Sequence, residues 1–250
     1  MRRGKRACEG VRREEDGRML KIENYEIVGW EHAIRGMRNP KNSWEKSDSE
    51  YAVNLVEDEH VSTCAYIGSN DWKLMSTLRN AGTDHRKFMR MITVYVDITA
   101  PLYWWKEYDT YKVGTVANSC STMHKIHDKE FTFGDFSHDY LIEEENGWIE
   151  DEKGYKWCCA PTCLETTVKT LNAYRYQYLK TKNKRYWYQM IQLLPSSYNQ
   201  KRTVMLNYEV LANMYKSRKN HKLDEWHVLC DWIESLPYSE LITGDRRAEE

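Results

Sequence analysis

Two polar residues near the C-terminus, Asn207 and Arg218, have types and a spacing that can hold a polar ligand. They lie 218 − 207 = 11 positions apart, in a run with apolar residues at helical spacing. At about 100° per residue, eleven residues return to within roughly 20° of the same direction. If this stripe is buried with Leu211 and Met214, the amide and the guanidinium both need partners there. Helix geometry alone favours a simple reading, a polar helix edge paired inside the fold.

The segments around this pair should hold it in place. The dipeptide Leu194-Pro195 ends the preceding segment, because a residue before proline is driven out of the helical conformation. Residues 203–219 are then predicted to be one helix, and residues 223–236 a second amphipathic helix that Pro237 ends. Both polar side chains would therefore come from one helix.

A cluster of thiols at residues 157–163, WCCAPTC, raises the question of a zinc site, because thiolates are zinc ligands. The cluster lacks the paired C-x-x-C spacing of structural zinc sites, and no His pair follows it. We therefore expect no metal, and we expect buried or unpaired thiols at Cys158, Cys159 and Cys163. Their role is left open by the sequence.

Residues 174–188 interleave basic and aromatic side chains. Such a patch can stack nucleic-acid bases and hold a phosphate backbone. The commoner structure is an exposed helix hairpin on which lysine stems lie along apolar surface. Residues 164–181 have apolar positions at helical spacing, so a helix is predicted there.

The N-terminal half is predicted to supply strands and short helices. Residues 1–18 are charged and nearly free of large apolar residues, so we expect them to be disordered and take Met19 as the natural start. Residues 71–81 should form a helix with Asp71 as N-cap. The predicted strands are 19–30 and 89–99, and the polar loop is 38–49. Helices and strands without a βαβ rhythm indicate the α+β class.

Composition limits the possible functions. The formal net charge of −1 gives no global case for a nucleic-acid or membrane binder. No apolar run is long enough to span a bilayer. Seven cysteines, an odd number, without a secretion signal favour reduced thiols in the cytoplasm.

The C-terminal pattern resembles the flavin-dependent thymidylate synthases (ThyX). That family has a Leu-Pro dipeptide, an Asn twelve positions on and an Arg eleven further. These positions fall without gaps on Pro195, Asn207 and Arg218. The family continues with Ala-Gln-Trp-Glu where this chain has LDEW at residues 223–226.

A second block extends the resemblance. The family has a His motif, a strand, Ala-Pro, a helix and an Arg- and Ser-rich signature. Matched from Ala100-Pro101, the family's first His falls on His85, the second signature Arg on Lys112, and its two Ser on Thr115 and Cys120. Other signature positions are replaced, by Thr110, Tyr111, Asn118 and Thr122. Because Lys does not replace Arg for two-pronged phosphate binding, phosphate recognition must be rebuilt or lost.

The resemblance implies a single domain over residues 19–250, made of mixed helices and a small, predominantly antiparallel sheet. It implies methylation of dUMP to dTMP in nucleotide biosynthesis, with FAD as cofactor and methylenetetrahydrofolate and NADPH as co-substrates. It also implies a cytoplasmic homotetramer with active sites at subunit interfaces, with no membrane and no stable nucleic-acid binding. The cofactor would then carry the redox chemistry, and the protein would supply orientation and charge.

The resemblance also implies roles for individual residues. Arg218 would be catalytic and would bind the substrate, stabilising charge that develops on the uracil ring. Glu209 stands where the family has a further Arg, and Cys120 is not expected to be a nucleophile. The implied flavin-binding residues are His85, Lys112, Asn207 and Asn213, and the other implied substrate contacts are Thr115 and Cys120.

Two other functions remain open. One is a catalytically altered flavin- or nucleotide-binding relative that kept the fold and lost the signature arginines. The other is a nucleic-acid-associated protein that uses residues 174–188. Flavin in the purified protein would separate the first two functions from the third, and turnover of dUMP would separate the enzyme from the altered relative.

Overall fold

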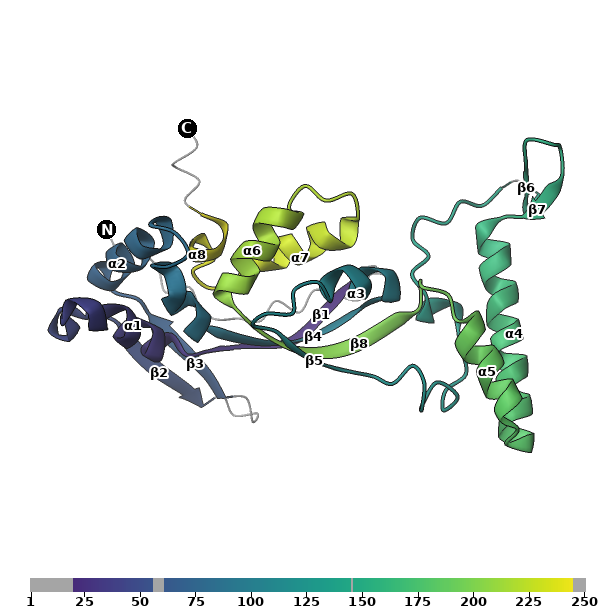
Figure 1. The fold of residues 1–250 in the computed structure, drawn as a ribbon, viewed down its shortest axis with the longest axis horizontal. Helices are drawn as coiled ribbons and strands as arrows, with labels where there is room; N and C mark the ends of the chain where they lie inside the picture. The colour runs from purple at the N-terminus through teal and green to yellow at the C-terminus, as the bar shows by residue number, and fades with distance from the viewer. Residues whose placement is uncertain (1–19, 56–60, 145, 245–250) are drawn as a thin grey trace.

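The computed structural model of the protein describes residues 20–55, 61–144 and 146–244. The expectations for residues 1–18 and for a start at Met19 lie outside these ranges. The centre is a four-stranded antiparallel sheet in the order β1-β4-β8-β5 (Figure 1). The strands are β1 (Lys21–Val28), β4 (Thr93–Pro101), β5 (Val116–Ser119) and β8 (Asn199–Asn207). Helices around a small antiparallel sheet confirm the predicted α+β class.

The two central strands, β4 and β8, pair along their whole length, from Thr93 opposite Asn207 to Pro101 opposite Asn199. Their side chains alternate between the two faces of the sheet. The buried face of these two strands carries six apolar residues: Val94, Val96, Ile98, Ala100, Val204 and Leu206. The predicted strand at 89–99 is therefore present but shifted, because residues 86–91 form the 3-10 helix η3 (Arg86–Met91).

The helix predicted over residues 203–219 is wrong in its first part. Residues 199–207 form β8, and helix α6 (Tyr208–Arg218) begins only after them. Val204 and Leu206 are buried two residues apart, as alternate residues of a strand are, and β4 supplies backbone hydrogen-bond partners along the whole segment. The change from strand to helix occurs at Asn207, whose side-chain oxygen accepts a 3.0 Å hydrogen bond from the Val210 amide.

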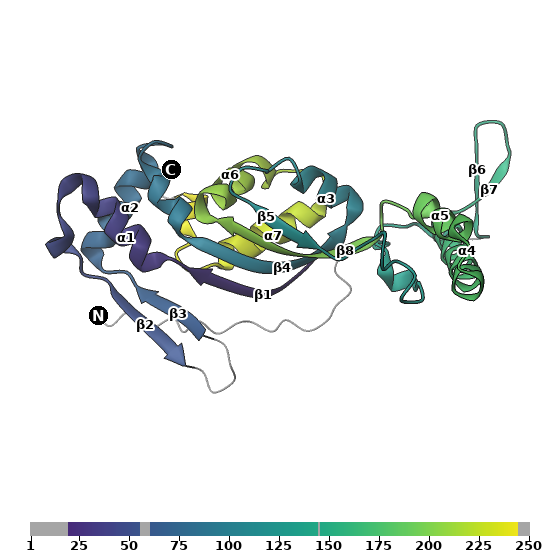
Figure 2. The same cartoon turned by 60° about the horizontal axis from the view of Figure 1, so that its bottom comes forward.

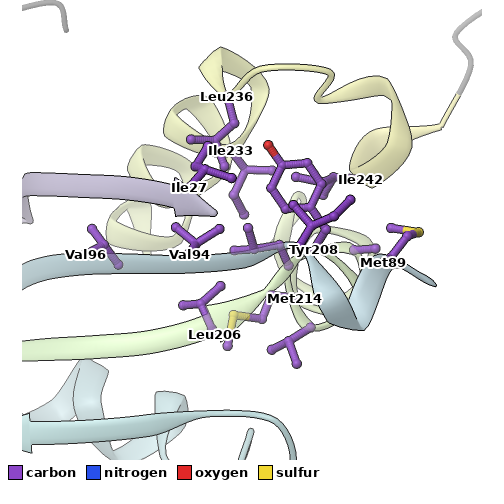
Figure 3. Close-up of a cluster of buried hydrophobic side chains, with 14 of the residues drawn as sticks. Ile27, Met89, Val94, Val96, Leu206, Tyr208, Met214, Ile233, Leu236 and Ile242 are labelled. Atoms are coloured by element: carbon purple, nitrogen blue, oxygen red, sulfur yellow. The ribbon is translucent and has the colours of Figure 1, made fainter. Parts of the chain in front are cut away.

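Helices α3 (Leu102–Tyr108), α6, α7 (Asp224–Ser235) and α8 (Glu240–Thr243) cover one face of the sheet (Figure 1). Trp104, Trp105 and Trp226 are fully buried between them. In Figure 3, Val94, Val96 and Leu206 point from the sheet toward Tyr208, Ile233 and Leu236. The opposite face carries exposed residues: Tyr95, Val116 and Thr203.

Helices α1 (Trp30–Arg38) and α2 (Ser69–Asn80) lie at one end of the sheet with the hairpin of β2 (Glu50–Leu55) and β3 (Val61–Tyr66) (Figure 1). The prediction that Asp71 is the N-cap of α2 is wrong. Asp71 lies inside the first turn of the helix, and its carboxylate is fully buried. It accepts a 2.6 Å hydrogen bond from Arg38. The capping bonds to the Asn70 and Asp71 amides come from Asp48 in the preceding loop. The Asp48 carboxylate, at the end of the polar loop at 38–49, is therefore used to cap α2.

The opposite end of the molecule is an arm, residues 121–198, that projects from the sheet (Figure 2). It contains α4 (Ala160–Thr181), α5 (Lys184–Leu193), and the hairpin of β6 (Trp148–Glu150) and β7 (Lys156–Cys158), with the short 3-10 turn η4 (Phe133–Asp135). Leu171 and Met190 are the centre of its own apolar cluster. The helix predicted over 164–181 is confirmed within α4. No helix in the described ranges is both long enough and apolar enough to cross a membrane.

Candidate functional site

Helix α6 carries three polar residues that the sequence singled out, Glu209, Asn213 and Arg218, and a fourth, Asn207, is its N-cap. Two neighbouring segments flank the N-terminal half of the helix. One segment is η3, and the other is the loop that joins α3 to β5. The amide of Tyr208 donates a 3.1 Å hydrogen bond to the carbonyl of Ile92, directly after η3. This bond fixes the start of α6 against the η3 edge.

At the η3 edge, Glu209 is buried, with 6% of its surface exposed, and two arginines neutralise it. Arg90 donates to Glu209 through Nε, and Arg86 Nε lies 3.4 Å from it. The second amino group of Arg86 donates a 3.0 Å bond to the Asn213 side chain. His85 is exposed directly before η3. The bond to Glu209 raises the pKa of Arg90, so this guanidinium stays charged.

This edge keeps a positive surface in spite of the acid. Two guanidinium groups and one carboxylate leave a formal charge of 2 − 1 = +1. The side chain of Arg90 is 54% exposed, whereas that of Arg86 is 20% exposed. The Arg90 guanidinium can therefore still bind an anion that approaches from solvent.

At the other edge, the loop between α3 and β5 approaches the start of α6 very closely. Gly114 has φ +78, and a Cβ on it would lie 3.0 Å from Val210 and 3.2 Å from the Asn207 amide nitrogen. Only glycine fits here without a shift in its neighbours. Lys112 and its neighbour Gly114 are exposed. The loop that carries Lys112 is therefore packed, at Gly114, against the capping residue Asn207.

Thr115 lies at the end of the same loop and is half-buried. Its hydroxyl donates a hydrogen bond to the carbonyl of Tyr111. The proton is used inside the loop, so the hydroxyl can only accept a further bond from a ligand. Cys120, at the end of β5, is an exposed thiol. Its backbone is fixed by a 2.9 Å bond to the Lys201 carbonyl.

Arg218, the last residue of α6, has the partners that its buried position requires. Nη1 donates a 2.6 Å bond to Glu107, and Nε donates a 3.0 Å bond to the Tyr111 hydroxyl. The guanidinium lies 4.5 Å from the ring centre of Trp226, and 16% of the side chain is exposed. Within the described ranges Nη2 has no hydrogen-bond partner, so it is the amino group that remains for a ligand.

The structure does not bring all the predicted residues into one place. Asn207 and Arg218 lie at opposite ends of α6, about 16 Å apart along its axis at 1.5 Å per residue. His85 and Asn213 lie at the η3 edge, Lys112 and Thr115 in the α3–β5 loop, and Cys120 at the far end of β5. A depression of about 330 Å³ between α6 and α7 is lined by Tyr215, His227 and neighbouring residues, and it contains none of these side chains.

Several residues that shape the site were not predicted. Arg86 and Arg90 lie four residues apart in a basic segment directly after His85. This spacing could have indicated that the two side chains share one helix face. Glu107, which holds Arg218, gave none, because 111 positions separate the two residues. In the described part of the chain, no group of three or more His, Cys, Asp or Glu side chains could hold a metal ion.

The basic and aromatic residues of 174–188 lie on the α4–α5 hairpin of the arm. Lys182 Nζ is 5.6 Å from the ring centre of Tyr178, and Lys184 Nζ is 5.2 Å from that of Tyr188. The lysines thus lie over their own aromatic neighbours, as expected for an exposed helix hairpin.

Comparisons with known proteins find solved structures with a similar fold. No family model matches the chain, and no curated protein matches it by sequence. Thymidylate synthase X (ThyX) from Helicobacter pylori, solved with FAD and dUMP, matches with a TM-score of 0.58 and 15% identity, over 90% of this chain and 96% of that one. A second structure of that enzyme with FAD and dUMP gives 0.56 and 14%, over 90% and 98%.

A third similar structure is the UMP/dUMP methylase PolB from Streptomyces cacaoi, bound with 5-Br UMP. It matches with a TM-score of 0.50 and 11% identity, over 86% of this chain and 87% of that one. At these identities the likeness establishes the fold. The chain therefore has the fold seen in flavin-dependent thymidylate synthase.

Proposed function

We propose that this protein methylates dUMP to dTMP with FAD as cofactor and with methylenetetrahydrofolate and NADPH as co-substrates. One observation carries the proposal. The fold matches a protein solved with FAD and dUMP over 90% of this chain and 96% of the other, so almost no part of that fold is missing. The pattern at Pro195, Asn207 and Arg218, which resembles that of the family, also supports the proposal.

The residues at the η3 edge fit a phosphate-bearing cofactor. Arg90 offers an exposed guanidinium, and His85 and Asn213 offer polar groups on either side of Arg86. Bound there, FAD would supply the electron transfer that methylation at this oxidation level needs. The protein residues would hold the phosphates and orient the ring.

The substrate would lie toward the loop between α3 and β5 and the C-terminal end of α6. Lys112 offers a point charge for the phosphate in place of the family's Arg, and Thr115 offers a hydroxyl oxygen that accepts hydrogen bonds. Arg218 would place its positive charge at the uracil and stabilise negative charge that develops there. Glu107 holds the guanidinium in one orientation for that purpose. Cys120 would contact the substrate without forming a covalent bond.

The proposal includes a homotetramer whose subunits complete the site together. The donors at His85, Lys112 and Cys120 are exposed on one subunit, on separate segments. A second subunit over this surface would exclude water and strengthen their interactions with charged ligands.

The Arg218→Ala variant tests the substrate part of the proposal. A hydrogen bond to a charged group contributes about 1.5–3 kcal/mol, so dUMP affinity should fall about 10- to 150-fold in calorimetry on flavin-loaded protein. Arg218→Lys should restore little, because a point charge does not replace a planar fork. Glu107→Gln is the matched control, since it removes the partner's charge but keeps an oxygen that can accept the bond from Arg218 Nη1, so the guanidinium should keep its orientation and dUMP binding should be retained. Equal affinity for Arg218→Ala and wild type, per folded molecule, would contradict the role of Arg218.

The cofactor part is tested by flavin absorbance of the purified protein. Arg90→Ala should release flavin, because it removes the exposed cation of the η3 edge. Lys87→Ala removes the same charge from an exposed position on the same turn and should keep the flavin bound. Protein that never contains or takes up flavin would contradict the proposal as a whole.

One observation favours a second candidate, a flavin- or nucleotide-binding relative with altered catalysis. Glu209 is a buried acid at a position where the family has an Arg, and it cancels half the charge of Arg86 and Arg90. Flavin and dUMP binding without any dTMP formation would support this candidate over the enzyme.

A further inference from the structure

Three cysteines meet where the β6–β7 hairpin joins the long helix of the arm. Cys158 is the last residue of β7, Cys159 is the N-cap of α4, and Cys163 lies in the first turn of α4. Cys158 stands one residue before the N-cap and Cys163 four residues after it, positions whose side chains commonly pack together, and the Cys158 thiol is close enough to raise the pKa of Cys163. Both residues are exposed. Two neighbouring thiols that are both open to solvent can be joined in a disulfide.

The third thiol has a separate partner. Sγ of Cys159 lies 3.3 Å from the hydroxyl oxygen of Thr162. Only 4% of the Cys159 surface is exposed. Hydrogen bonds from the Thr162 side chain and amide lower the pKa of this thiol. Cys159 is thus a covered thiol, distinct from the exposed pair on either side of it.

We propose that Cys158 and Cys163 are a redox-active pair that a low-molecular-weight disulfide, such as glutathione disulfide, oxidises to an intramolecular disulfide. The thiolate of Cys158 attacks one sulfur of glutathione disulfide, forming a mixed disulfide and releasing one glutathione thiolate. The thiolate of Cys163 then attacks Sγ of Cys158 and releases the second glutathione. Two cysteines lose two protons and two electrons, and one glutathione disulfide becomes two glutathiones.

Cys163 acts second because its thiol ionises less readily than an ordinary cysteine thiol. Partial burial and the neighbouring Cys158 thiol raise the pKa of Cys163. Formation of the mixed disulfide on Cys158 removes that neighbouring thiol, and Cys163 then has an electrophilic sulfur beside it to attack.

The disulfide would act on the most weakly held part of the arm. The β6–β7 hairpin has three residue pairs, and all six of its strand residues are exposed. A two-stranded hairpin is marginally stable by itself. A bond from Cys158 to the first turn of α4 would tie the hairpin to the helix and slow tryptic cleavage after Lys153.

All three cysteines lie on one tryptic peptide, residues 157–169, which makes the test direct. The full-length protein is incubated with excess glutathione disulfide, denatured in N-ethylmaleimide, digested and analysed by mass spectrometry. We expect the peptide to carry one N-ethylmaleimide group after oxidation and three after reduction. A peptide that carries three groups after oxidation, or one that keeps glutathione on Cys158, would overturn the proposal.

Three variants identify the pair. Cys159→Ser should keep the disulfide, so its oxidised peptide should carry no N-ethylmaleimide. Cys163→Ser should lose the intramolecular bond, and its product should be a glutathione adduct on Cys158. Cys120→Ser changes an exposed cysteine elsewhere and should leave the result unchanged. An intramolecular disulfide that survives in Cys163→Ser, or is absent in Cys159→Ser, would show that the assigned pair is wrong.

Discussion

The molecule has two regions that are stabilised by apolar cores of very different size. One is the sheet with its covering helices, and the other is the arm. In the first region, 31 of the described residues form one apolar cluster, which includes three tryptophans that are fully buried. The arm has its own cluster of seven residues. All the predicted site residues belong to the sheet region, and the exposed thiol pair belongs to the arm. The large core can hold side chains in fixed geometry, whereas the small one leaves a region that can respond to its surroundings.

Ion pairs differ between the regions in the same way. Arg38 and Asp71 are bonded at 2.6 Å with almost no exposed surface. In the arm, Glu165 and Lys169 are bonded at 2.7 Å with side chains that are 59% and 72% exposed. The distances are nearly equal, so burial, together with the further hydrogen bonds that Asp71 accepts from residues 47–49, should decide what each pair contributes.

The largest effect is expected for Asp71→Ala. This change leaves the Arg38 guanidinium buried without its partner, and breaking a buried pair from one side costs about 3–5 kcal/mol. Urea unfolding should show that loss in the free energy of unfolding. In the arm, Glu165→Ala should cost no more than about 0.5 kcal/mol. Equal losses for the two variants would show that burial does not separate the regions.

A smaller and more local effect is expected for Met190→Ala. Met190 is fully buried in the arm cluster, and such a truncation costs about 2–5 kcal/mol. Because the arm has its own core, amide hydrogen exchange should rise in α4 and α5 and stay unchanged in β4 and β8. Met214→Ala, a matched change in the sheet region, should raise exchange across the sheet instead. Loss of protection in β4 for Met190→Ala would mean that the two regions unfold together.

The sequence predicted the elements whose local pattern agrees with their final environment. The β-branched run of β4 and the apolar spacing of α4 and α7 are examples, since each pattern is satisfied within one element. The helix predicted for the residues just before Asn207 was wrong, because the spacing of their apolar residues fits a helix as well as a strand. Only pairing with β4, a segment about one hundred residues away, decides between them.

The candidate site was predictable only in part for the same reason. The spacing of Asn207 and Arg218 correctly indicated that both polar groups would need partners. Their partners could not be read from the chain, because Glu107 and Tyr111 come from a distant helix and loop. The Asn207 amide instead caps the helix that it begins.

The smallest effect concerns acid stability on the open face of the sheet. Asp97 accepts a 2.6 Å hydrogen bond from the Thr203 hydroxyl, a 3.1 Å bond from Asn24, and a 3.1 Å ion pair from Lys201. The hydrogen bond from Thr203, with those from Asn24 and Lys201, lowers the pKa of Asp97. The folded state therefore binds this proton less readily than the unfolded state does.

The direction of the pH effect on stability follows from that difference in proton binding. The Asp97 carboxylate stabilises the fold at pH values above its unfolded pKa of about 3.9, and the contribution is lost as the pH falls through the lower folded value. Asp97→Asn should thus cost about 0.2–1 kcal/mol near neutral pH, as for other partly exposed pairs, and the gap to wild type should close in acid. Glu152→Gln, on the exposed hairpin of the arm, should match wild type in urea unfolding at every pH. An Asp97→Asn gap that widens toward low pH would reverse the sign, and a pH-dependent gap for Glu152→Gln would show that the arm also holds a carboxylate in place.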